Sequence, residues 1–180
     1  MRIALFGGSF DPPHLGHVFA AVHARLVGQV DQVWAEPVAH HPYAKQLSPW
    51  QQRLIMTQAA FADLSFVTVR EDELENPNGH TFSLVEHLQS AYPEHQWVLV
   101  GGSDTYADMG NWHRGSELQK MVTVHAVPRR GFDHTNPAAL PELSSSLLRR
   151  LLSENLPVDG MLPSAVLNLI ATNNWYQTAS

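Results

Sequence analysis

Cysteine, positive charge and long apolar runs are scarce in this sequence. The absence of cysteine excludes disulfides, thiolate zinc sites and cysteine nucleophiles, and it fits a reducing compartment. No run approaches the roughly 20 apolar residues that span a bilayer. The apolar start, residues 1–7, is too short for a secretory signal. We therefore expect a cytoplasmic chain that does not associate with membranes.

The shortage of positive charge limits the partners. The 11 Lys and Arg residues are outnumbered by 17 Asp and Glu, which gives a net charge of -6 at pH 7. A general nucleic-acid-binding surface is therefore not expected, although the 11 His residues can add to a local cationic pocket. The 180 residues, 44% of them hydrophobic, suit a single domain over residues 1–180. Association of copies into a homo-oligomer is left open.

Short apolar runs alternate with segments of helical periodicity. This alternation is typical of an α/β protein with a parallel sheet covered on both faces, a Rossmann-like doubly wound fold. Ser48 as N-cap with Pro49 at the first position predicts one helix start. The inward face of the first helix is predicted to hold Leu15, Val18 or Phe19, Val22 and Leu26. Strands are expected at residues 2–6, 32–36, 66–69, 96–100 and 121–127, a loop at 128–141, and a helical C-terminal part at 142–180.

Two of the expected strands run into glycine pairs, Gly7-Gly8 and Gly101-Gly102. In a doubly wound sheet, ligands bind beyond the carboxyl ends of the strands, where the strand order reverses. Both pairs would lie at that rim. By analogy, this placement indicates a nucleotide site.

The first glycine pair opens the string Gly7-Gly8-Ser9-Phe10-Asp11-Pro12-Pro13-His14-Leu15-Gly16-His17. His14 and His17 are three residues apart at a helix start, so they share one helical face. A helix N-terminus already attracts anions, and two imidazoles add donors that can stabilise charge growing on a phosphate. Zinc binding is disfavoured, because no Glu stands between the histidines and no third ligand is evident. No protein-held metal site is expected.

A second element lies near the C-terminus, in Leu143-Ser144-Ser145-Ser146-Leu147-Leu148-Arg149. Serines at a helix start offer hydroxyls and free N–H groups, and Arg149 adds a planar fork for phosphate oxygens one turn later. Taken alone, the segment also reads as a capped amphipathic helix, with a leucine stripe facing the core.

These strings resemble the HxGH nucleotidyltransferase superfamily, and in particular its nicotinate mononucleotide adenylyltransferases. The 37–45 segment, the Ser48-to-Met56 helix, Gly102-Ser103-Asp104 with Trp112, and the segment from Leu162 to Tyr176 also resemble that family in order. The resemblance implies transfer of AMP from ATP to nicotinate mononucleotide, releasing pyrophosphate and forming deamido-NAD. It also implies Mg²⁺ held mainly through the ATP phosphates.

Carried over by that resemblance, three residues would be catalytic: His14, His17 and Arg149. ATP would be bound by Gly7, Gly8, Ser9, Phe10, Gly102, Asp104, Ser144 and Ser145. The acceptor would be bound by Lys45, Arg53, Thr81 and Trp112. Asp11 is interpreted as a turn or cap residue at least as readily as a ligand.

The sequence departs from the family on the acceptor side. Where the family has Tyr-Thr-x-Asp, this chain has His80-Thr81-Phe82-Ser83, and Lys45 is displaced by one residue within its loop. Nicotinamide mononucleotide, phosphopantetheine or a cytidylyl-type substrate therefore remain alternatives, as does an ATP-binding regulatory module without activity. The 37–47 loop fits a mobile lid and a fixed loop equally well.

Overall fold

The sheet is the centre of the molecule. The computed structural model describes residues 1–42, 45–128 and 143–177, and its strands form one parallel sheet in the order β3-β2-β1-β4-β5. The predicted Rossmann-like α/β fold is thereby confirmed, and the strand order reverses between β1 and β4. The strands are β1 (Arg2–Gly8), β2 (Gln32–Pro37), β3 (Val67–Val69), β4 (Gln96–Gly102) and β5 (Thr123–Val127).

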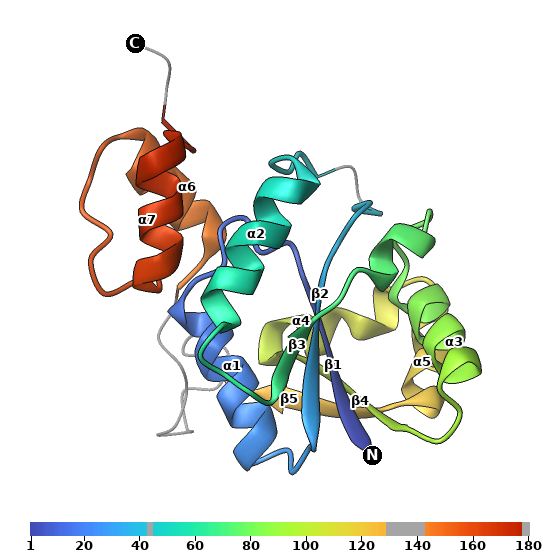
Figure 1. The fold of residues 1–180 in the computed structure, drawn as a ribbon. Coiled ribbons are helices and arrows are strands. Elements are labelled where there is room, and N and C mark those ends of the chain that lie inside the picture. The colour runs from blue at the N-terminus through green and yellow to red at the C-terminus, as the bar shows by residue number, and fades with distance from the viewer. Residues whose placement is uncertain (43–44, 129–142, 178–180) are drawn as a thin grey trace.

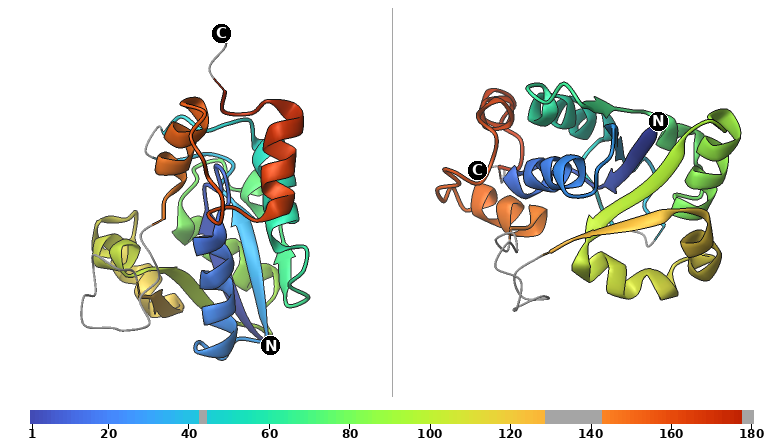
Figure 2. Two further views of the ribbon diagram at one scale, coloured as in Figure 1. Left: turned by 90° about the vertical axis from the view of Figure 1, so that its left-hand side faces the viewer. Right: turned by 90° about the horizontal axis from the view of Figure 1, so that it is seen from below.

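Helices cover both faces of the sheet (Figures 1 and 2). The packing of α1 and α2 buries one face, whereas α3 and α5 bury the other. The C-terminal helices α6 and α7 lie beside the sheet and form a third core cluster with α2. The α-helices are α1 (Leu15–Leu26), α2 (Trp50–Phe61), α3 (Thr81–Ala91), α4 (Ser103–Asp108), α5 (Gly115–Met121), α6 (Ser145–Ser153) and α7 (Ser164–Asn173).

The buried face of α1 differs from the predicted one. Ala20, Ala21 and Ala24 face the sheet, whereas Phe19 is 49% exposed and Leu26 is 72% exposed. Alanines at this face let the helix axis approach the sheet closely, which larger side chains would prevent. The prediction that Leu26 points inward was therefore wrong, and of the alternatives Val18 and Phe19 it is Val18 that packs on the core.

Two short helices, α4 and α5, were not predicted, and β5 begins at Thr123 because α5 continues through Met121. Helices of six and seven residues are too short to show a clear period and depend on packing for their stability. Buried Met109, in the 3₁₀ turn Met109–Asn111, and Leu118 supply that packing.

The start of α2 was predicted one residue too early. Pro49 is the N-cap, and the backbone N–H of Ser48 donates instead to Asp11. By contrast, Ser144 is the N-cap of α6 and accepts a hydrogen bond from Leu147 N, as predicted for a capped helix. Most of the predicted loop at 128–141 lies outside the described residues.

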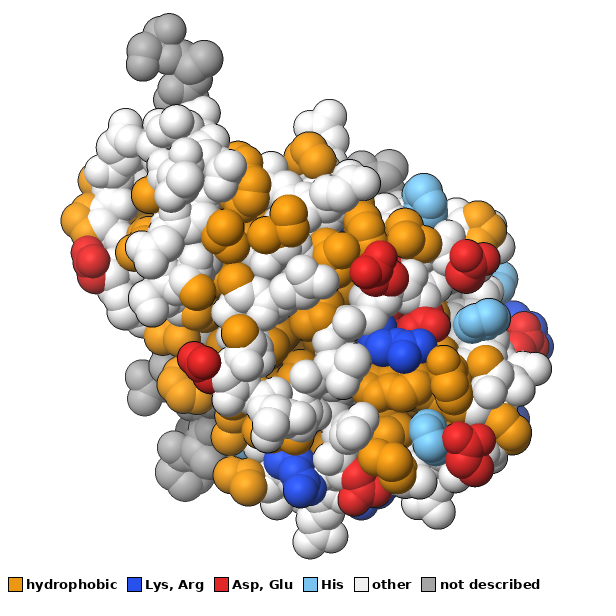
Figure 3. Space-filling model, in the orientation of Figure 1, with side chains coloured by type: hydrophobic (Ala, Val, Ile, Leu, Met, Phe, Trp, Pro, Cys, Tyr) orange, Lys and Arg blue, Asp and Glu red, His pale blue; other side chains and the backbone are white. Residues whose placement is uncertain are grey.

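The surface agrees with the charge balance of the sequence. On the face drawn in Figure 3, Lys and Arg side chains are separated from one another, and histidines gather on the side of α3. Such scattered cations do not favour nucleic-acid binding on that face. In the described part of the chain, no helix has the length and apolarity that crossing a membrane requires.

Candidate active site

A cavity of about 640 Å³ opens beyond the carboxyl ends of β1 and β4. Both glycine pairs, Gly7-Gly8 and Gly101-Gly102, line it, as predicted from the doubly wound pattern. Its size suits a nucleotide. Within the described residues, histidines and acids line this cavity, but no Lys or Arg does.

His14 and His17 lie side by side in the wall of this cavity. Their ring centroids are 3.8 Å apart, and His14, the N-cap of α1, is only 5% exposed. The backbone N–H of His14 donates to His17 Nδ1 at 3.1 Å. Because Nδ1 accepts, the neutral His17 ring carries its proton on Nε2, which makes that nitrogen a donor.

Glycine is required between the two histidines. A Cβ on Gly16 would lie 2.9 Å from His14 Nδ1, closer than real Cβ contacts come. Gly16 therefore allows the His14 ring to fold back over the helix start.

Phe10 lies in the same loop but contributes differently from the prediction. It adopts a left-handed backbone conformation with φ 46°, and its side chain is fully buried against Phe6 and Phe61. A bulky residue in this region is strained, and aromatic packing holds it there. Only the backbone of Phe10 can therefore contact a ligand.

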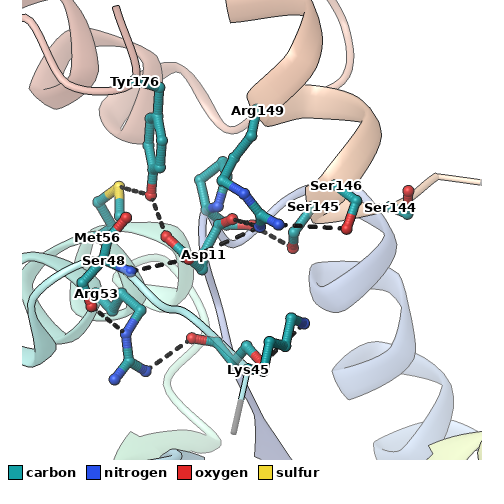
Figure 4. A network of polar contacts seen from close by, with 12 residues as sticks. Asp11, Lys45, Ser48, Arg53, Met56, Ser144, Ser145, Ser146, Arg149 and Tyr176 are labelled. Atoms are coloured by element: carbon teal, nitrogen blue, oxygen red, sulfur yellow. Dashed lines mark hydrogen bonds and ion pairs between the residues drawn. The ribbon is translucent and has the colours of Figure 1, made fainter. Parts of the chain in front are cut away.

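Arg149 and Lys45 do not line the cavity, but both contact the first motif, whose residue Ser9 does line it. Figure 4 shows the two side chains with Asp11. Arg149 donates to the backbone carbonyl of Asp11 at 2.6 Å and to Ser146 Oγ at 3.3 Å. Lys45 Nζ lies 3.4 Å from Ser9 Oγ. Burial, and next the charge of Arg149, lower the pKa of Lys45, whereas Asp11 opposes that shift. Two cations near the first motif favour the binding of an anion at this end of the cavity.

The serine hydroxyls of the second motif already have partners. Ser144 Oγ accepts from Leu147 N, and Ser145 Oγ donates to the Pro12 carbonyl at 2.9 Å. Ser145 thus ties the start of α6 to the loop before α1, whereas Ser144 caps α6 itself. The group that can still bind a phosphate here is the N-terminal end of α6, because the first N–H groups of a helix have no partner within the helix.

Arg53, predicted to bind the acceptor, is an internal support. Its side chain is 2% exposed and donates to three backbone carbonyls, those of Ser48, Ser9 and Val38. Burial lowers its pKa, and the Asp11 charge counteracts that effect. This geometry does not support direct contact between Arg53 and an acceptor. Instead, Arg53 braces the first motif against the loop after β2.

The far end of the cavity is formed by aromatic and polar side chains. Thr81 and Trp112 line it, together with Asp104 from the start of α4. The His80 and His113 rings stack there, with centroids 4.3 Å apart and planes at 14°. Flat rings at this end suit a planar ligand group.

An acidic cluster lies next to this end. Glu36, Asp72 and Glu73 come from β2 and the turn after β3, and Glu73 also lines the cavity. Burial, and next the charge of Asp72, raise the pKa of Glu36 to about 9. Burial raises the pKa of Glu73 to about 7, against the hydrogen bond from Asn76. Glu36 is therefore protonated at neutral pH.

Sequence reasoning missed the roles of Asp11 and Tyr176 and the positions of Glu73 and His41 in the cavity wall. Asp11 is 1% exposed and accepts from the Tyr176 hydroxyl at 2.7 Å. Its place inside the first motif was a usable signal. For Tyr176, 165 positions away, no local pattern reveals the contact.

Comparison with known proteins identifies similar sequences over nearly the whole chain. Residues 5–151 match the model of the cytidylyltransferase-like family. A protein of Anaeromyxobacter sp. (strain K), named "Probable nicotinate-nucleotide adenylyltransferase", is 36% identical, with 98% of this chain and 97% of that protein covered. A protein of the same name from Thermus thermophilus is 34% identical, with coverages of 98% and 100%.

Among solved structures, the nicotinic acid mononucleotide adenylyltransferase of Plasmodium falciparum complexed with NaAD superposes with a TM-score of 0.82. Its sequence identity is 18%, and 97% of each chain is covered. At that identity, the likeness supports the fold alone.

Proposed function

The chain belongs to the cytidylyltransferase-like family and, within it, to the nicotinate-nucleotide adenylyltransferases, and on that premise we propose that it transfers AMP from ATP to nicotinate mononucleotide. The products are pyrophosphate and deamido-NAD, so the reaction is a step of NAD biosynthesis. The observation that carries this proposal is the His14–His17 pair, set at a helix N-terminus in the cavity between two glycine pairs.

The proposed reaction is a direct displacement. An oxygen of the acceptor's 5′-phosphate bonds to the α-phosphorus of ATP, and the bond from that phosphorus to the bridging oxygen of the β-phosphate breaks. The electron pair leaves with pyrophosphate. No protein nucleophile or strong base is needed, because the attacking phosphate is already ionised at pH 7. Catalysis then depends on alignment and on stabilising charge.

In our proposal, the histidines and the cationic side chains stabilise charge on different phosphates of ATP. His17 Nε2 donates to the reacting phosphate, and His14 supports it from the helix N-cap. Arg149 and Lys45, which contact Asp11 and Ser9, bind the β- and γ-phosphates. Lys45, which the sequence assigned to the acceptor, thus acts on the ATP side. The backbone at Ser144 and Ser145 adds the N-terminus of α6.

The acceptor and the ribose occupy the other end in this proposal. Trp112 stacks on the pyridine ring, and Thr81 binds the acceptor from the first position of α3. Asp104 and Gly102 bind the ATP ribose at the junction of β4 and α4. Arg53 acts indirectly, by holding Ser9 in place.

We propose Mg²⁺ as the metal ion of the reaction. In the described part of the chain, no group of three or more His, Cys, Asp or Glu side chains could hold a metal. The cavity instead offers donors suited to phosphate, so Mg²⁺ would be held by the ATP oxygens and by water. When bound, it would supply charge neutralisation across the phosphates.

We also propose that the chain works as one domain. Helices α6 and α7 pack on α2, and Arg149 and Tyr176 both bond Asp11 of the first motif. The C-terminal helical part is thereby joined to the site it helps to build. We propose a cytoplasmic location, because the ATP that the reaction consumes is held inside the cell.

The deciding experiment measures pyrophosphate release with ATP, Mg²⁺ and a panel of acceptors, with products identified by mass spectrometry. Nicotinate mononucleotide should give deamido-NAD at the highest kcat/KM. Phosphopantetheine, and CTP in place of ATP, should give no product. Tight ATP binding without turnover of any acceptor would instead indicate a regulatory module.

Nicotinamide mononucleotide is the second candidate acceptor, for a specific reason. Glu73 and Asp108 line the cavity, and the described lining residues include no Lys or Arg. Acids without a compensating cation disfavour the nicotinate carboxylate relative to the neutral carboxamide. A kcat/KM for nicotinamide mononucleotide equal to or above that for nicotinate mononucleotide would reverse the preference.

A further inference from the structure

The carboxylate of Asp11 connects three distant parts of the chain (Figure 4). Its Oδ2 accepts from Ser48 N at 3.1 Å, and its Oδ1 accepts from the Tyr176 hydroxyl at 2.7 Å. The Arg149 guanidinium lies 3.7 Å from Oδ2 and also donates to the Asp11 backbone carbonyl. One buried group thus contacts the start of α2, helix α6 and the C-terminal segment.

Such a buried charge is tolerated only when hydrogen bonds and opposite charge surround it. Tyr176 contributes one of these bonds, and toward a carboxylate its phenol can act only as a donor. Burial, and next the charge of Asp11, raise the pKa of Tyr176, so its phenol stays protonated. Loss of the hydroxyl would leave Asp11 Oδ1 without this bond and would free the carboxylate to shift toward Arg149.

The backbone around Tyr176 indicates that this contact is enforced. Asn174 has φ 53° and Tyr176 has φ 65°, both in the left-handed region that non-glycine residues rarely adopt. For a bulky side chain this conformation is strained and persists only where the surroundings hold it. The Tyr176 hydroxyl lies 2.7 Å from Asp11 Oδ1 and 3.8 Å from Met56 Sδ. The strained turn therefore holds the hydroxyl against the Asp11 carboxylate.

Tyr176 also lies outside residues 5–151, the part that matches the family model. It follows α7, which packs on α2 rather than on the sheet. The C-terminal segment therefore contacts the first motif from outside the matched residues, and that contact ends on Asp11, which binds Arg149.

We infer that Tyr176 is a positioning residue, which holds Arg149 in its phosphate-binding orientation through the Asp11 carboxylate. The inference rests on the proposed function in one respect, namely that Arg149 binds ATP phosphates. The C-terminal segment then sets how well ATP binds, although it does not touch ATP.

The first test is Tyr176→Phe, which removes the hydroxyl alone. Binding of ATP with Mg²⁺, measured by isothermal titration calorimetry without acceptor, should weaken about fivefold, part of the effect of one hydrogen bond to a charged group. The KM for nicotinate mononucleotide should stay unchanged. Tyr92→Phe is the matched control, because it removes a hydroxyl that accepts a hydrogen bond from Arg70, next to β3. It should leave ATP binding unchanged.

A double-mutant cycle separates positioning from general stabilisation. In an Arg149→Ala background, Tyr176→Phe should cause no further loss of ATP binding, because the group it positions is gone. Losses that multiply independently in the double variant would overturn the inference. So would unchanged ATP binding in Tyr176→Phe itself. Thermal unfolding of each variant shows whether a loss reflects folding instead, and a loss explained by unfolding would also overturn it.

The outcomes for the two proposals are distinguishable. Wild-type protein that binds ATP but converts no acceptor would end the proposed activity, and the calorimetric cycle would still decide the role of Tyr176. Wild-type protein that turns over normally, with ATP binding indifferent to Tyr176, would end the inference alone. Failure of wild-type protein to bind ATP would end both.

Discussion

The proposed phosphate end and the proposed acceptor end of the cavity are built from different kinds of contact. At the phosphate end, directional hydrogen bonds join the first motif to α2, α6 and the C-terminal segment through Asp11 and Arg53. At the acceptor end, ring stacking of His80 on His113 and the packing of Trp112 predominate. Directional bonds permit one arrangement, whereas stacked rings accept many flat partners. We therefore expect these contacts to restrict the geometry of phosphate binding more tightly than the identity of the acceptor.

The largest effect should come from the phosphate end. His17→Ala removes the Nε2 donor and should lower kcat by about 10²-fold or more, the scale of losing one preorganised donor. Steady-state kinetics at saturating ATP and acceptor measure this. His87→Ala, on the exposed side of α3, is the control and should leave kcat unchanged. A kcat for His17→Ala close to that of wild type would show that His17 does not stabilise the reacting phosphate.

Arg149→Ala should have the next largest effect. Losing one charge-assisted contact should lower kcat/KM for ATP by about 10- to 100-fold. Arg149→Lys should recover only part of this loss, because an ammonium cannot reproduce the planar fork that reaches Asp11 and Ser146. The KM for the acceptor should not change in either variant. An equal rise in both KM values would show that the two ends are not separate.

A smaller effect is expected from His80→Ala at the acceptor end. Loss of one stacked ring should raise the KM for nicotinate mononucleotide by about 2- to 10-fold, while calorimetric ATP binding stays constant. Helix α3 should remain intact, because the His80 side chain makes no capping hydrogen bond. Weaker ATP binding in this variant would contradict the division into two ends.

The smallest effect on turnover is expected from Glu36→Gln, in the acidic cluster next to the acceptor end. The folded-state pKa of Glu36, about 9, lies above its ordinary value of 4.5. Its contribution to stability is therefore complete below pH 4.5 and is lost as pH rises toward 9. Glutamine mimics the protonated acid, so the variant should lose less stability than wild type between those pH values.

Urea unfolding at several pH values measures this difference. At pH 8, the free energy of unfolding of the variant should exceed that of wild type by a few kcal/mol at most, at about 1.4 kcal/mol per pKa unit. At pH 4.5 the two should converge. Glu75→Gln, which changes an exposed acid of the turn after β3, is the control and should follow the wild-type profile. Parallel profiles for Glu36→Gln and wild type would show that Glu36 is ionised in the folded state.

The strands and the cavity were predictable from the sequence because both depend on local patterns. Apolar runs followed by glycine pairs indicated β1 and β4, and parallel pairing brings their carboxyl ends together. The short helices α4 and α5 were not predictable, since packing of Met109 and Leu118 stabilises them rather than a helical period.

Within the site, residue types were easier to predict than their partners. His14 and His17 were predicted to share a helical face, but His14 is the N-cap with an extended backbone, and its N–H bond to His17 Nδ1 brings the rings together. Arg53 and Lys45 were assigned to the acceptor by their place in the sequence, yet tertiary contacts bring both close to Ser9. The contact between Asp11 and Tyr176 depends on the path of the whole chain, which no local window contains.

The order of the site segments along the chain has a consequence for how such enzymes change over evolutionary time. The phosphate end is formed by residues 7–17 and 143–149, whereas the acceptor end is formed by residues 79–81 and 112–113. The second pair is nested inside the first along the chain. A single gene conversion that replaces residues 79–113 would therefore exchange the whole acceptor end and inherit both phosphate stretches from one parent. A single crossover between residues 85 and 107 would instead divide both ends between two parents.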